Sequence, residues 1–286
     1  MDGACISQQI NCSPLDILSS TSFDRKKEKL IKLAKSVLNH PKHKDEFQSL
    51  MALLGVNESE IMRDYIHYNL NIRAFSNEIY ELLSMRFVLH IHNLLQRSGH
   101  QERQVVISEF VAMTGANTVA DVGFDVPTLF VKEALQTRRL NITLCDDERS
   151  SFIFAQALLG LWDLRLRDVI SFKQTDVDAS HFIGDFDTYI FKDSLQHFSD
   201  PTYYLYNCVK QSPAHAQFVF SVPIGPIISS HYMAWSTKKE AIAWLDLCGL
   251  EIKVQREVHV NPAVDLFAEP FGYKFYDLIA LCDKKL

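Results

Sequence analysis

The chain has 286 residues, enough for one or two domains of average size. Hydrophobic residues make up 47% and charged residues 22%, which is typical of globular proteins and excludes a disordered, collagen-like or membrane-bundle chain. The formal net charge is −6, from 29 Lys and Arg against 35 Asp and Glu. Because an acidic surface repels phosphate backbones, we expect no nucleic-acid partner.

The sequence indicates neither a membrane protein nor a metal site. No apolar run reaches the ~18–20 residues of a membrane span, and residues 1–16 lack the basic and hydrophobic segments of a secretory signal, so we expect a cytoplasmic protein. The six cysteines are scattered, without a C-x-x-C pair or zinc-like spacing. Four of them lie inside apolar runs and are predicted to be small buried hydrophobes in a chain without a metal site: Cys145, Cys208, Cys248 and Cys282.

The first part of the chain has helical patterning. Residues 1–22 are polar and aperiodic, which indicates a flexible N-terminal arm. Apolar residues then recur at a 3.6-residue period, so residues 23–110 are predicted to be an all-helical lid or substrate domain. The helices are expected from Ser22 or Asp24 to Leu38, and over 44–54, 58–67 and 69–96.

The pattern changes near residue 117, where short apolar strands begin to alternate with helices. Strands are expected at 118–122, 141–145, 169–172, 186–191, 217–221, 251–257 and 273–282, and helices at 128–138, 148–160, 201–210 and 237–248. Such alternation predicts an α/β fold, a doubly wound and mostly parallel seven-stranded Rossmann-like sheet over residues 111–286. The two late strands indicate an antiparallel edge pair.

Polar residues follow four of the predicted strands. In a doubly wound sheet, ligands bind beyond the carboxyl ends of the strands, where the strand order reverses. Asp146, after the second strand, can accept hydrogen bonds from both hydroxyls of a ribose, and Asp176, after the third, can accept from an adenine amino group. These are the positions that a nucleoside-containing cofactor requires.

Five segments in this order resemble the class I S-adenosylmethionine (SAM) dependent methyltransferase family. They are Val119-Ala120-Asp121-Val122-Gly123, Leu144-Cys145-Asp146, Phe172 to Asp176, Phe186-Asp187 with Leu195 to Pro201, and Phe220-Ser221-Val222-Pro223 before a helix from Thr237 to Gly249. The resemblance implies that SAM is the cofactor, that Asp146 holds its ribose and that Asp176 contacts its adenine. It also places the loop at Asp121 and Gly123 beside the methionine part. The full set of predicted cofactor-binding residues is Asp121, Gly123, Asp125, Asp146, Asp147, Asp176 and Lys192.

One loop departs from the family pattern. The family usually has three glycines, as D-x-G-x-G-x-G, whereas this chain keeps Gly123 and has Asp125 and Pro127 at the next two places. Because proline fixes φ and has no N–H, the loop must follow another path. Asp125 then either pairs with the methionine ammonium group or belongs to a decayed loop that binds nothing.

The loop after the fourth strand carries the predicted catalytic residues. His197 is placed to act as a general base, although a histidine here can also serve packing alone, and Asp193 is placed to bind a substrate amine. Residues 223–235 lie where family members carry substrate-recognition elements. Tyr65, Tyr68, Tyr80 and Arg73 are expected either to line a lid or to pack in the helical core, and His90 and His92, two apart on a helix, are not expected to bind a metal.

The resemblance implies alkyl transfer from SAM, most simply methyl transfer to a small molecule. The sequence leaves a homodimer open as the state of assembly. Nicotianamine-synthase-like enzymes also join a helical N-terminal domain to this sheet, and transfer or cyclise the aminocarboxypropyl arm of SAM instead. A third reading is a non-catalytic binding protein that keeps the fold. A nucleic-acid methyltransferase is disfavoured by the charge and by the lack of an Asn/Asp-Pro-Pro-Tyr-like motif.

Overall fold

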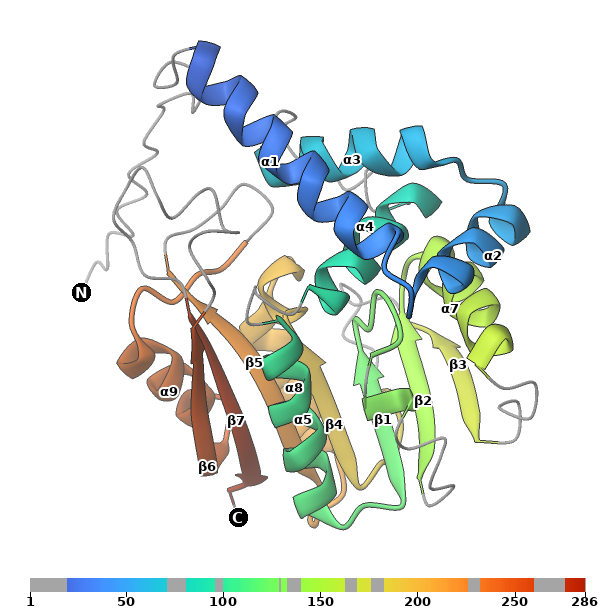
Figure 1. Cartoon of the computed structure of the whole chain (residues 1–286). Coiled ribbons are helices and arrows are strands. Elements are labelled where there is room, and N and C mark those ends of the chain that lie inside the picture. Colours follow the sequence, from blue (N-terminus) through green and yellow to red (C-terminus); the bar gives the residue numbers. More distant parts are fainter. Residues whose placement is uncertain are drawn as a thin grey trace.

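A helical cap lies over one edge of an α/β sheet (Figure 1). The computed structural model describes residues 20–70, 81–95, 100–128, 130–132, 140–162, 169–175, 183–225, 232–259 and 276–285. Within these residues the order of elements is four cap helices, one helix before the sheet, and then strands alternating with helices. The change of pattern near residue 117 therefore marks the start of the sheet.

The sheet has seven strands in the order β3-β2-β1-β4-β5-β7-β6. They are β1 (Thr118–Val122), β2 (Asn141–Asp146), β3 (Ile170–Gln174), β4 (Thr188–Lys192), β5 (Gln217–Ile224), β6 (Leu250–His259) and β7 (Tyr276–Lys284). Only β7 runs antiparallel to its neighbours, β5 and β6. The predicted mostly parallel sheet and its antiparallel edge pair are confirmed. The chain crosses from β3 back to β4 on the other side of β1, so the strand order reverses between β1 and β4.

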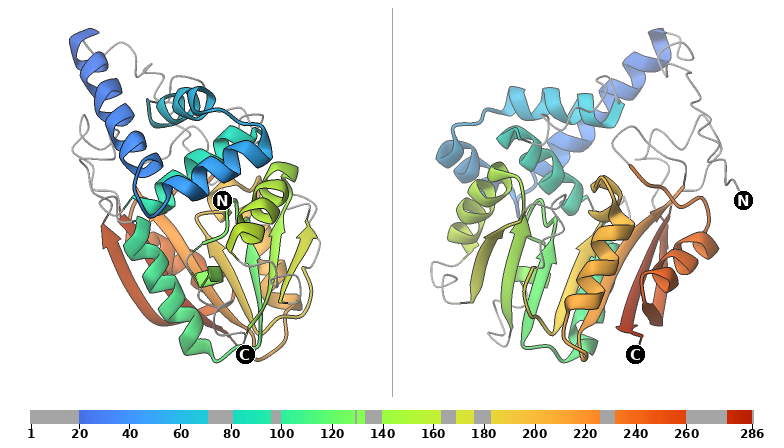
Figure 2. Two further views of the ribbon diagram at one scale, coloured as in Figure 1. Left: turned by 45° about the vertical axis from the view of Figure 1, so that its right-hand side comes forward. Right: turned by 180° about the vertical axis from the view of Figure 1, so that it is seen from behind.

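Helices cover both faces of the sheet because alternate residues of the strands point to opposite sides. On one side, Val119 of β1 packs in a cluster with α5 (His100–Thr114) and α7 (Arg149–Trp162). On the other side, Ala120 and Val122 pack with α8 (Pro201–Gln211) and α9 (Lys238–Leu247). Seen from behind in Figure 2, α8 and α9 lie in front of the sheet, whereas α5 lies in front of it in Figure 1.

Local signals fix where the later helices begin. The Asp200 side chain accepts a hydrogen bond from the Tyr203 N–H, and Pro201 occupies the first turn of α8, where its missing N–H costs nothing. The Thr237 side chain accepts from the Glu240 N–H and caps α9 in the same way. These caps explain why both helices were predictable to within a residue or two.

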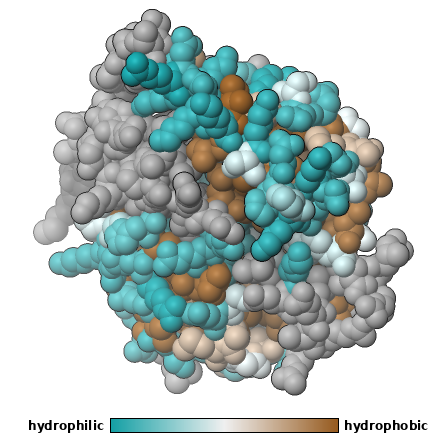
Figure 3. Space-filling model, viewed as in Figure 1, coloured by the Kyte–Doolittle hydropathy of each residue, from teal (hydrophilic) through white to brown (hydrophobic). Residues whose placement is uncertain are grey.

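The cap consists of α1 (Ser20–Leu38), α2 (Lys44–Leu54), α3 (Glu58–Leu70) and α4 (Leu83–Leu94). Its core contains one large buried residue from each of these helices: Leu30, Phe47, Tyr65 and Phe87. The same cluster includes Val126 of the loop after β1 and Phe154 of α7, so the cap packs directly on that loop and on the helix that follows β2. Hydrophilic side chains run along the outer side of α1 in Figure 3, where Lys27, Lys29, Lys32 and Lys35 are exposed.

The prediction of one helix over residues 69–96 is wrong. Helix α3 ends at Leu70, and α4 begins at Leu83, preceded by Leu82 in an extended conformation (φ −77°, ψ 131°). A 3.6-residue stripe identifies the buried face of a helix, but two helices that pack on the same core produce the same stripe as one. Residues 71–80, with Arg73 and Tyr80, lie outside the described residues.

Two further boundaries differ from the expected ones. Helix α5 crosses the boundary expected between residues 110 and 111, and it packs on the sheet beside β5 and β7. Strand β5 continues three residues past Ser221, through Pro223. Beyond Ser221 the strand no longer pairs with β4, so the missing N–H of Pro223 interrupts no bond on that side.

The described cysteines Cys145, Cys208, Cys248 and Cys282 are free and buried, as predicted. Among the described segments, none of the helices combines the length and the apolar character that crossing a membrane demands.

Glu46 joins the cap to α7, and its removal should weaken that junction. Its two carboxylate oxygens contact His90 Nε2 at 3.0 Å and accept from Trp162 Nε1 at 2.7 Å. We expect Glu46→Ala to lower the free energy of unfolding by about 1–3 kcal/mol, because it leaves a buried histidine and an indole N–H without their partner. Urea denaturation measures this. Gln48→Ala, at an exposed position of the same helix, is the matched control and should change it by less than about 0.5 kcal/mol; an equal loss in both variants would contradict the role of Glu46.

Candidate functional site

The candidate site lies at the carboxyl ends of β2, β1 and β4, which are adjacent in the sheet. Val122 of β1 is paired with Phe191 of β4, so the next residues, Gly123 after β1 and Lys192 at the end of β4, lie side by side. The cap covers this edge through α4 and through Val126. The reversal of strand order between β1 and β4 therefore coincides with the polar strand ends identified from the sequence.

Gly123 is required where β1 ends. Its φ is +66°, its N–H donates to the Cys145 carbonyl at 2.8 Å, and an added Cβ would lie 2.5 Å from the Ser194 Cβ. A side chain here would be strained and would collide with the loop after β4. The one glycine that remains of the family pattern is thus the one at which the two loops touch.

The rest of this loop follows a different path from a glycine-rich one. Asp125 has a φ of +54°, and the Val126 N–H donates to the Phe124 carbonyl at 2.5 Å, which makes a γ-turn centred on Asp125. Val126 is then buried in the cap core. The loop is therefore fixed by a tight turn and by a hydrophobic anchor in the cap.

Asp121 is a buried acid without a donor. Its side chain is completely buried, and neither carboxylate oxygen has a hydrogen-bond partner among the described residues. Its pKa is raised to about 6 because the carboxyl is buried; the charge of Lys192 opposes this shift and that of Asp125 adds to it. A buried carboxylate without donors costs free energy, so Asp121 is suited to a ligand that brings a donor or a positive charge.

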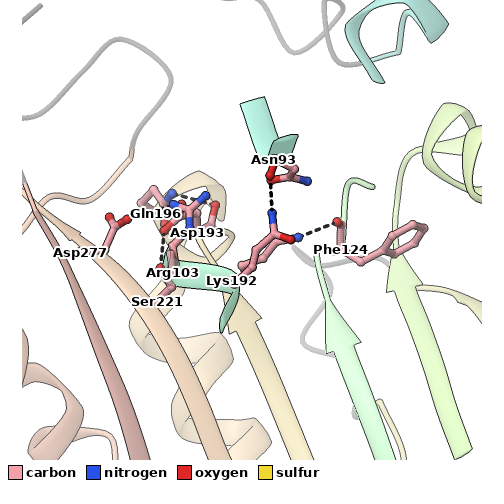
Figure 4. A network of polar contacts seen from close by, with 9 residues as sticks. Asn93, Arg103, Phe124, Lys192, Asp193, Gln196, Ser221 and Asp277 are labelled. Atoms are coloured by element: carbon pink, nitrogen blue, oxygen red, sulfur yellow. Dashed lines mark hydrogen bonds and ion pairs between the residues drawn. The ribbon is translucent and has the colours of Figure 1, made fainter. Parts of the chain in front are cut away.

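Lys192, the last residue of β4, is a cation that interacts electrostatically with Asp121. It is buried, and its Nζ donates to the Phe124 carbonyl at 3.2 Å (Figure 4). Burial lowers its pKa, while the charges of Asp121 and Asp125 oppose the shift. Since an ammonium group carries three donors, Lys192 retains donors for a ligand beside Asp121.

Asp146, at the end of β2, is enclosed by backbone donors. Its Oδ1 accepts from the Glu148 N–H at 2.9 Å and its Oδ2 from the Asp125 N–H at 3.1 Å, and the residue is 3% exposed. Its pKa is raised to about 7, first by burial and then by the charge of Asp125, whereas Arg86 lowers it. The predicted ribose acceptor is therefore held directly against the loop after β1.

Arg86 connects this acid to the cap. It lies on α4, is completely buried, and donates from Nη1 to Asp125 Oδ1 at 2.7 Å and from Nε to Ser150 Oγ at 3.0 Å. Asp125, with its side chain 34% exposed, thus pairs with an arginine of this chain. The partner of Asp125 in the structure is therefore Arg86, where the sequence had suggested a methionine ammonium group.

A second polar cluster lies on the β5 side of the site (Figure 4). Arg103 of α5 donates from Nη1 to Asp193, which follows β4, and to Asp277 of β7 at 3.1 Å. Asp193 has a φ of +48° and also accepts from Ser221 Oγ at 2.9 Å, while its carbonyl accepts from Gln196 Nε2 at 2.7 Å. Burial raises the pKa of Asp277 although Arg103 opposes the shift. The Asp193 side chain is therefore held from α5 and from β5, while β7 holds Arg103.

The sequence-predicted residues divide into three groups. The structure brings together Asp121, Gly123, Asp125, Asp146, Lys192 and Asp193. Asp147 follows β2 and is exposed, and His197 is half-buried on the short helix η4 (Leu195–His197). Asp176 lies outside the described residues.

Three polar residues of these clusters were not identified from the sequence: Arg86, Arg103 and Asp277. Arg86 had a signal, because it is the only Asp, Glu, Lys or Arg between residues 82 and 95. Asp277 had a weaker one, as an acid inside a late apolar strand. Tyr65, a candidate lid residue, is completely buried and stacks on His92, with a centroid distance of 5.2 Å.

In the part of the chain that the structure describes, no three His, Cys, Asp or Glu side chains are grouped so that they could hold a metal ion. His90 contacts Glu46 and His92 contacts the Asn69 amide at 3.2 Å, so the two histidines lie in separate surroundings within the cap.

No family model matches the sequence, and no curated protein matches it. Solved structures do match. An O-methyltransferase family protein from Burkholderia thailandensis is 13% identical with a TM-score of 0.60, over 96% of this chain and 98% of that one. The [4+2]-cyclase SpnF is 13% identical with a TM-score of 0.52, over 65% of this chain and 81% of that one. StiE O-MT is 13% identical with a TM-score of 0.50, over 65% of this chain and 75% of that one.

The chain has the Rossmann-like fold of class I SAM-dependent methyltransferases, with the strand order typical of that fold. The similarity to the Burkholderia protein extends over the cap as well as the sheet, since it covers 96% of the chain. Because a [4+2]-cyclase shares the fold, the reaction has to be inferred from the residues of the site.

Gly123→Ala should test the contact between the two loops. Gly115 has nearly the same φ, +65°, but an added Cβ there has nothing within 4 Å. We expect Gly115→Ala to lower the free energy of unfolding by about 1 kcal/mol because of backbone strain. Gly123→Ala should lower it by about 1–3 kcal/mol more because of the collision with Ser194. Urea denaturation of both variants gives the difference. Adding Ser194→Gly to Gly123→Ala should recover part of the excess; equal costs at the two glycines would refute the contact.

Asp121→Asn should reveal the ionisation of the buried acid. In the wild type the carboxyl has a pKa of about 6 when folded and its ordinary value of 3.8 when unfolded. The folded state therefore holds its proton longer, and the wild type loses stability relative to the variant as the pH rises through this interval. From pH 5 to pH 8, the free energy of unfolding of the wild type should fall by about 1 kcal/mol relative to that of Asp121→Asn. Comparing the two proteins at each pH cancels other titrating groups, and a constant difference would contradict the raised pKa.

Proposed function

We propose that the chain is a SAM-dependent transferase that methylates a small molecule. The observation that carries this proposal is the completely buried carboxylate of Asp121, whose oxygens lack donors among the described residues and which lies at the strand-order reversal of a methyltransferase fold. A structural acid would be expected to have its donors within the protein. An acid that binds a ligand receives its hydrogen bonds from that ligand instead.

The groups beside Asp121 fit the two charged ends of an α-amino acid. Asp121 offers an acceptor and a negative charge for the ammonium group of SAM. Lys192 offers donors and a positive charge for its carboxylate, and the two side chains interact electrostatically. The buried Ser194 hydroxyl, also without a partner among the described residues, lies against Gly123 and adds a further polar group there.

The nucleoside end would be held on the β2 side. Asp146 retains acceptor capacity, because each carboxylate oxygen has two lone pairs and accepts only one backbone N–H. We assign it to the ribose hydroxyls, with Asp147 beside it, and Asp176 to the adenine, as the resemblance implies.

Bound SAM would supply a methyl group activated by its sulfonium charge. The residues of this chain would contribute position and a dry surrounding, which account for most of the catalysis in such transfers. The acids Asp121, Asp125 and Asp146 outnumber the nearby cations Lys192 and Arg86, so the site favours a cationic ligand. Asp193 and His197 both follow β4, and we assign Asp193 to orient a substrate amine and His197 to accept a proton.

One observation favours a second candidate, a binding protein without activity. Asp146 is only 3% exposed, so the loop at Asp125 has to move before a diol can reach it. Transfer of the aminocarboxypropyl arm is a third possibility that uses the same contacts. Mass spectrometry separates the reactions, since methyl transfer leaves S-adenosylhomocysteine and the other transfer leaves methylthioadenosine.

Two ligands that differ by the amino-acid arm can test the two halves of the site. We expect calorimetry to show that Asp121→Asn weakens S-adenosylhomocysteine by roughly 10- to 100-fold, because the ammonium group loses its acceptor, but leaves methylthioadenosine, which lacks that arm, nearly unaffected. Asp146→Asn should weaken both ligands by a similar factor, because both contain the ribose.

Asp147→Asn is the control for a general loss of acidity near β2, and it should have a smaller effect than Asp146→Asn because Asp147 is exposed. If the wild-type protein binds neither S-adenosylhomocysteine nor SAM at near-millimolar concentration, the transferase proposal fails. If both variants weaken both ligands equally, the assignment of Asp121 to the amino-acid arm fails.

A further inference from the structure

We propose that Arg86 is a positioning residue of the nucleoside site, which acts through Asp125 to set the reach and the charge of Asp146. The inference rests on the proposed function, because it assigns a role toward a nucleoside ligand. It goes beyond it by giving the cap a defined part in cofactor binding. No residue of the cap was expected to act on the cofactor site in this way.

The first observation is a chain of direct contacts from the cap to the acid. Arg86 Nη1 lies 2.7 Å from Asp125 Oδ1, and the Asp125 N–H lies 3.1 Å from Asp146 Oδ2. Asp125 thus contacts the cap with its side chain and the ribose acceptor with its backbone. A displacement of Arg86 has to move the amide that Asp146 accepts from.

The second observation is that Arg86 itself is fixed. Its side chain is completely buried, and its Nε donates to Ser150 Oγ in the first turn of α7 at 3.0 Å. Asp125 is held further by its γ-turn, and the following residue, Val126, packs in the cap core. The cap therefore anchors the loop through an ion pair and through hydrophobic packing at consecutive residues.

The third observation is the balance of charge around Asp146. The groups that face it are Asp125 from the loop after β1, Asp147 and Glu148 from the turn after β2, Arg86 from α4 and Lys192 from β4. Asp125 disfavours ionisation of Asp146, whereas Arg86 favours it. The two members of the ion pair consequently act on Asp146 with opposite signs.

This opposition gives the proposal its test. An ionised Asp146 accepts from ribose hydroxyls, so a nucleoside should bind less well as the pH falls and Asp146 becomes protonated. Removing the negative charge of Asp125 should keep Asp146 ionised to lower pH. Removing the positive charge of Arg86 should raise the pKa of Asp146, so that Asp146 is protonated already at higher pH. A loss of structure alone would not move the two variants in opposite directions.

The experiment is calorimetry of methylthioadenosine binding between pH 5.5 and pH 8.5, with the wild type, Asp125→Asn, Arg86→Gln and the double variant. This ligand lacks the amino-acid arm assigned to Asp121, so the pKa of Asp121, about 6, does not enter the measurement. For the wild type we expect affinity to fall below about pH 7, where the pKa of Asp146 lies. The midpoint should move down by about one pH unit in Asp125→Asn and up by about one unit in Arg86→Gln. In the double variant it should return toward the wild-type value.

Several outcomes would overturn the proposal. Shifts in the same direction, or no shift in Asp125→Asn, would show that the ion pair does not act on the ribose acceptor. Asp146→Asn should abolish the pH dependence; if the dependence persists, another group is responsible. Since Arg86 is completely buried, circular dichroism is used to check that Arg86→Gln folds. Arg86→Lys keeps the positive charge and should keep the wild-type midpoint. If neither arginine variant folds, the result with Asp125→Asn alone decides.

The same data distinguish the two proposals. If the wild type binds and Asp146→Asn weakens methylthioadenosine, while neither charge variant shifts the midpoint, the transferase proposal stands and the role of Arg86 is refuted. If the wild type does not bind methylthioadenosine, the role of Arg86 is refuted, and if it binds no S-adenosylhomocysteine or SAM either, both are refuted.

Discussion

The burial of acidic side chains at the carboxyl ends of β1 and β2 is the constraint on which the site depends. Asp121 and Asp146 are almost completely removed from solvent, and each has a raised pKa. Burying a carboxylate without sufficient compensation costs stability, so a sequence under selection for stability alone would replace it. Asp146 has two backbone N–H donors, whereas Asp121 has none among the described residues, so the proposed ligand would supply Asp121 with a donor and a positive charge.

The altered loop after β1 is ordered by other means than glycine. Gly123 remains because the Ser194 side chain leaves no room for a Cβ. Beyond it, Asp125 adopts a left-handed φ, which an aspartate tolerates better than most residues, and Val126 enters the cap core. The conformational freedom that three glycines would provide is thus replaced by attachment to α4. A loop of this kind connects the cap directly to the carboxyl ends of β1 and β2.

The sheet was predictable because its signals are local. The limits of β1 were predicted to the residue, since four apolar or β-branched residues and Asp121 form a short run that ends at a glycine. Asp146 was identified because an acid comes at the end of a buried strand. The break before α4 was not predictable, because the apolar stripe continues through Leu82. The contacts of the site were less predictable still. The ion pair of Arg103 with Asp277 joins residues 174 positions apart, and no pattern within either segment indicates the other.

The two arginines that sequence patterns did not assign have one feature in common. Arg86 on α4 pairs with Asp125 in the loop after β1, and Arg103 on α5 pairs with Asp193 in the loop after β4. Helices α4 and α5 are consecutive and pack against each other, and both precede the sheet in the chain. The strands and their loops therefore provide Lys192 and the acids of the site, and the helices before the sheet provide the two arginines that pair with Asp125 and Asp193. Because both halves are anchored to one pair of packed helices, a movement of α4 on cofactor binding would be transmitted to the loop after β4, where the substrate of the proposed reaction would be held.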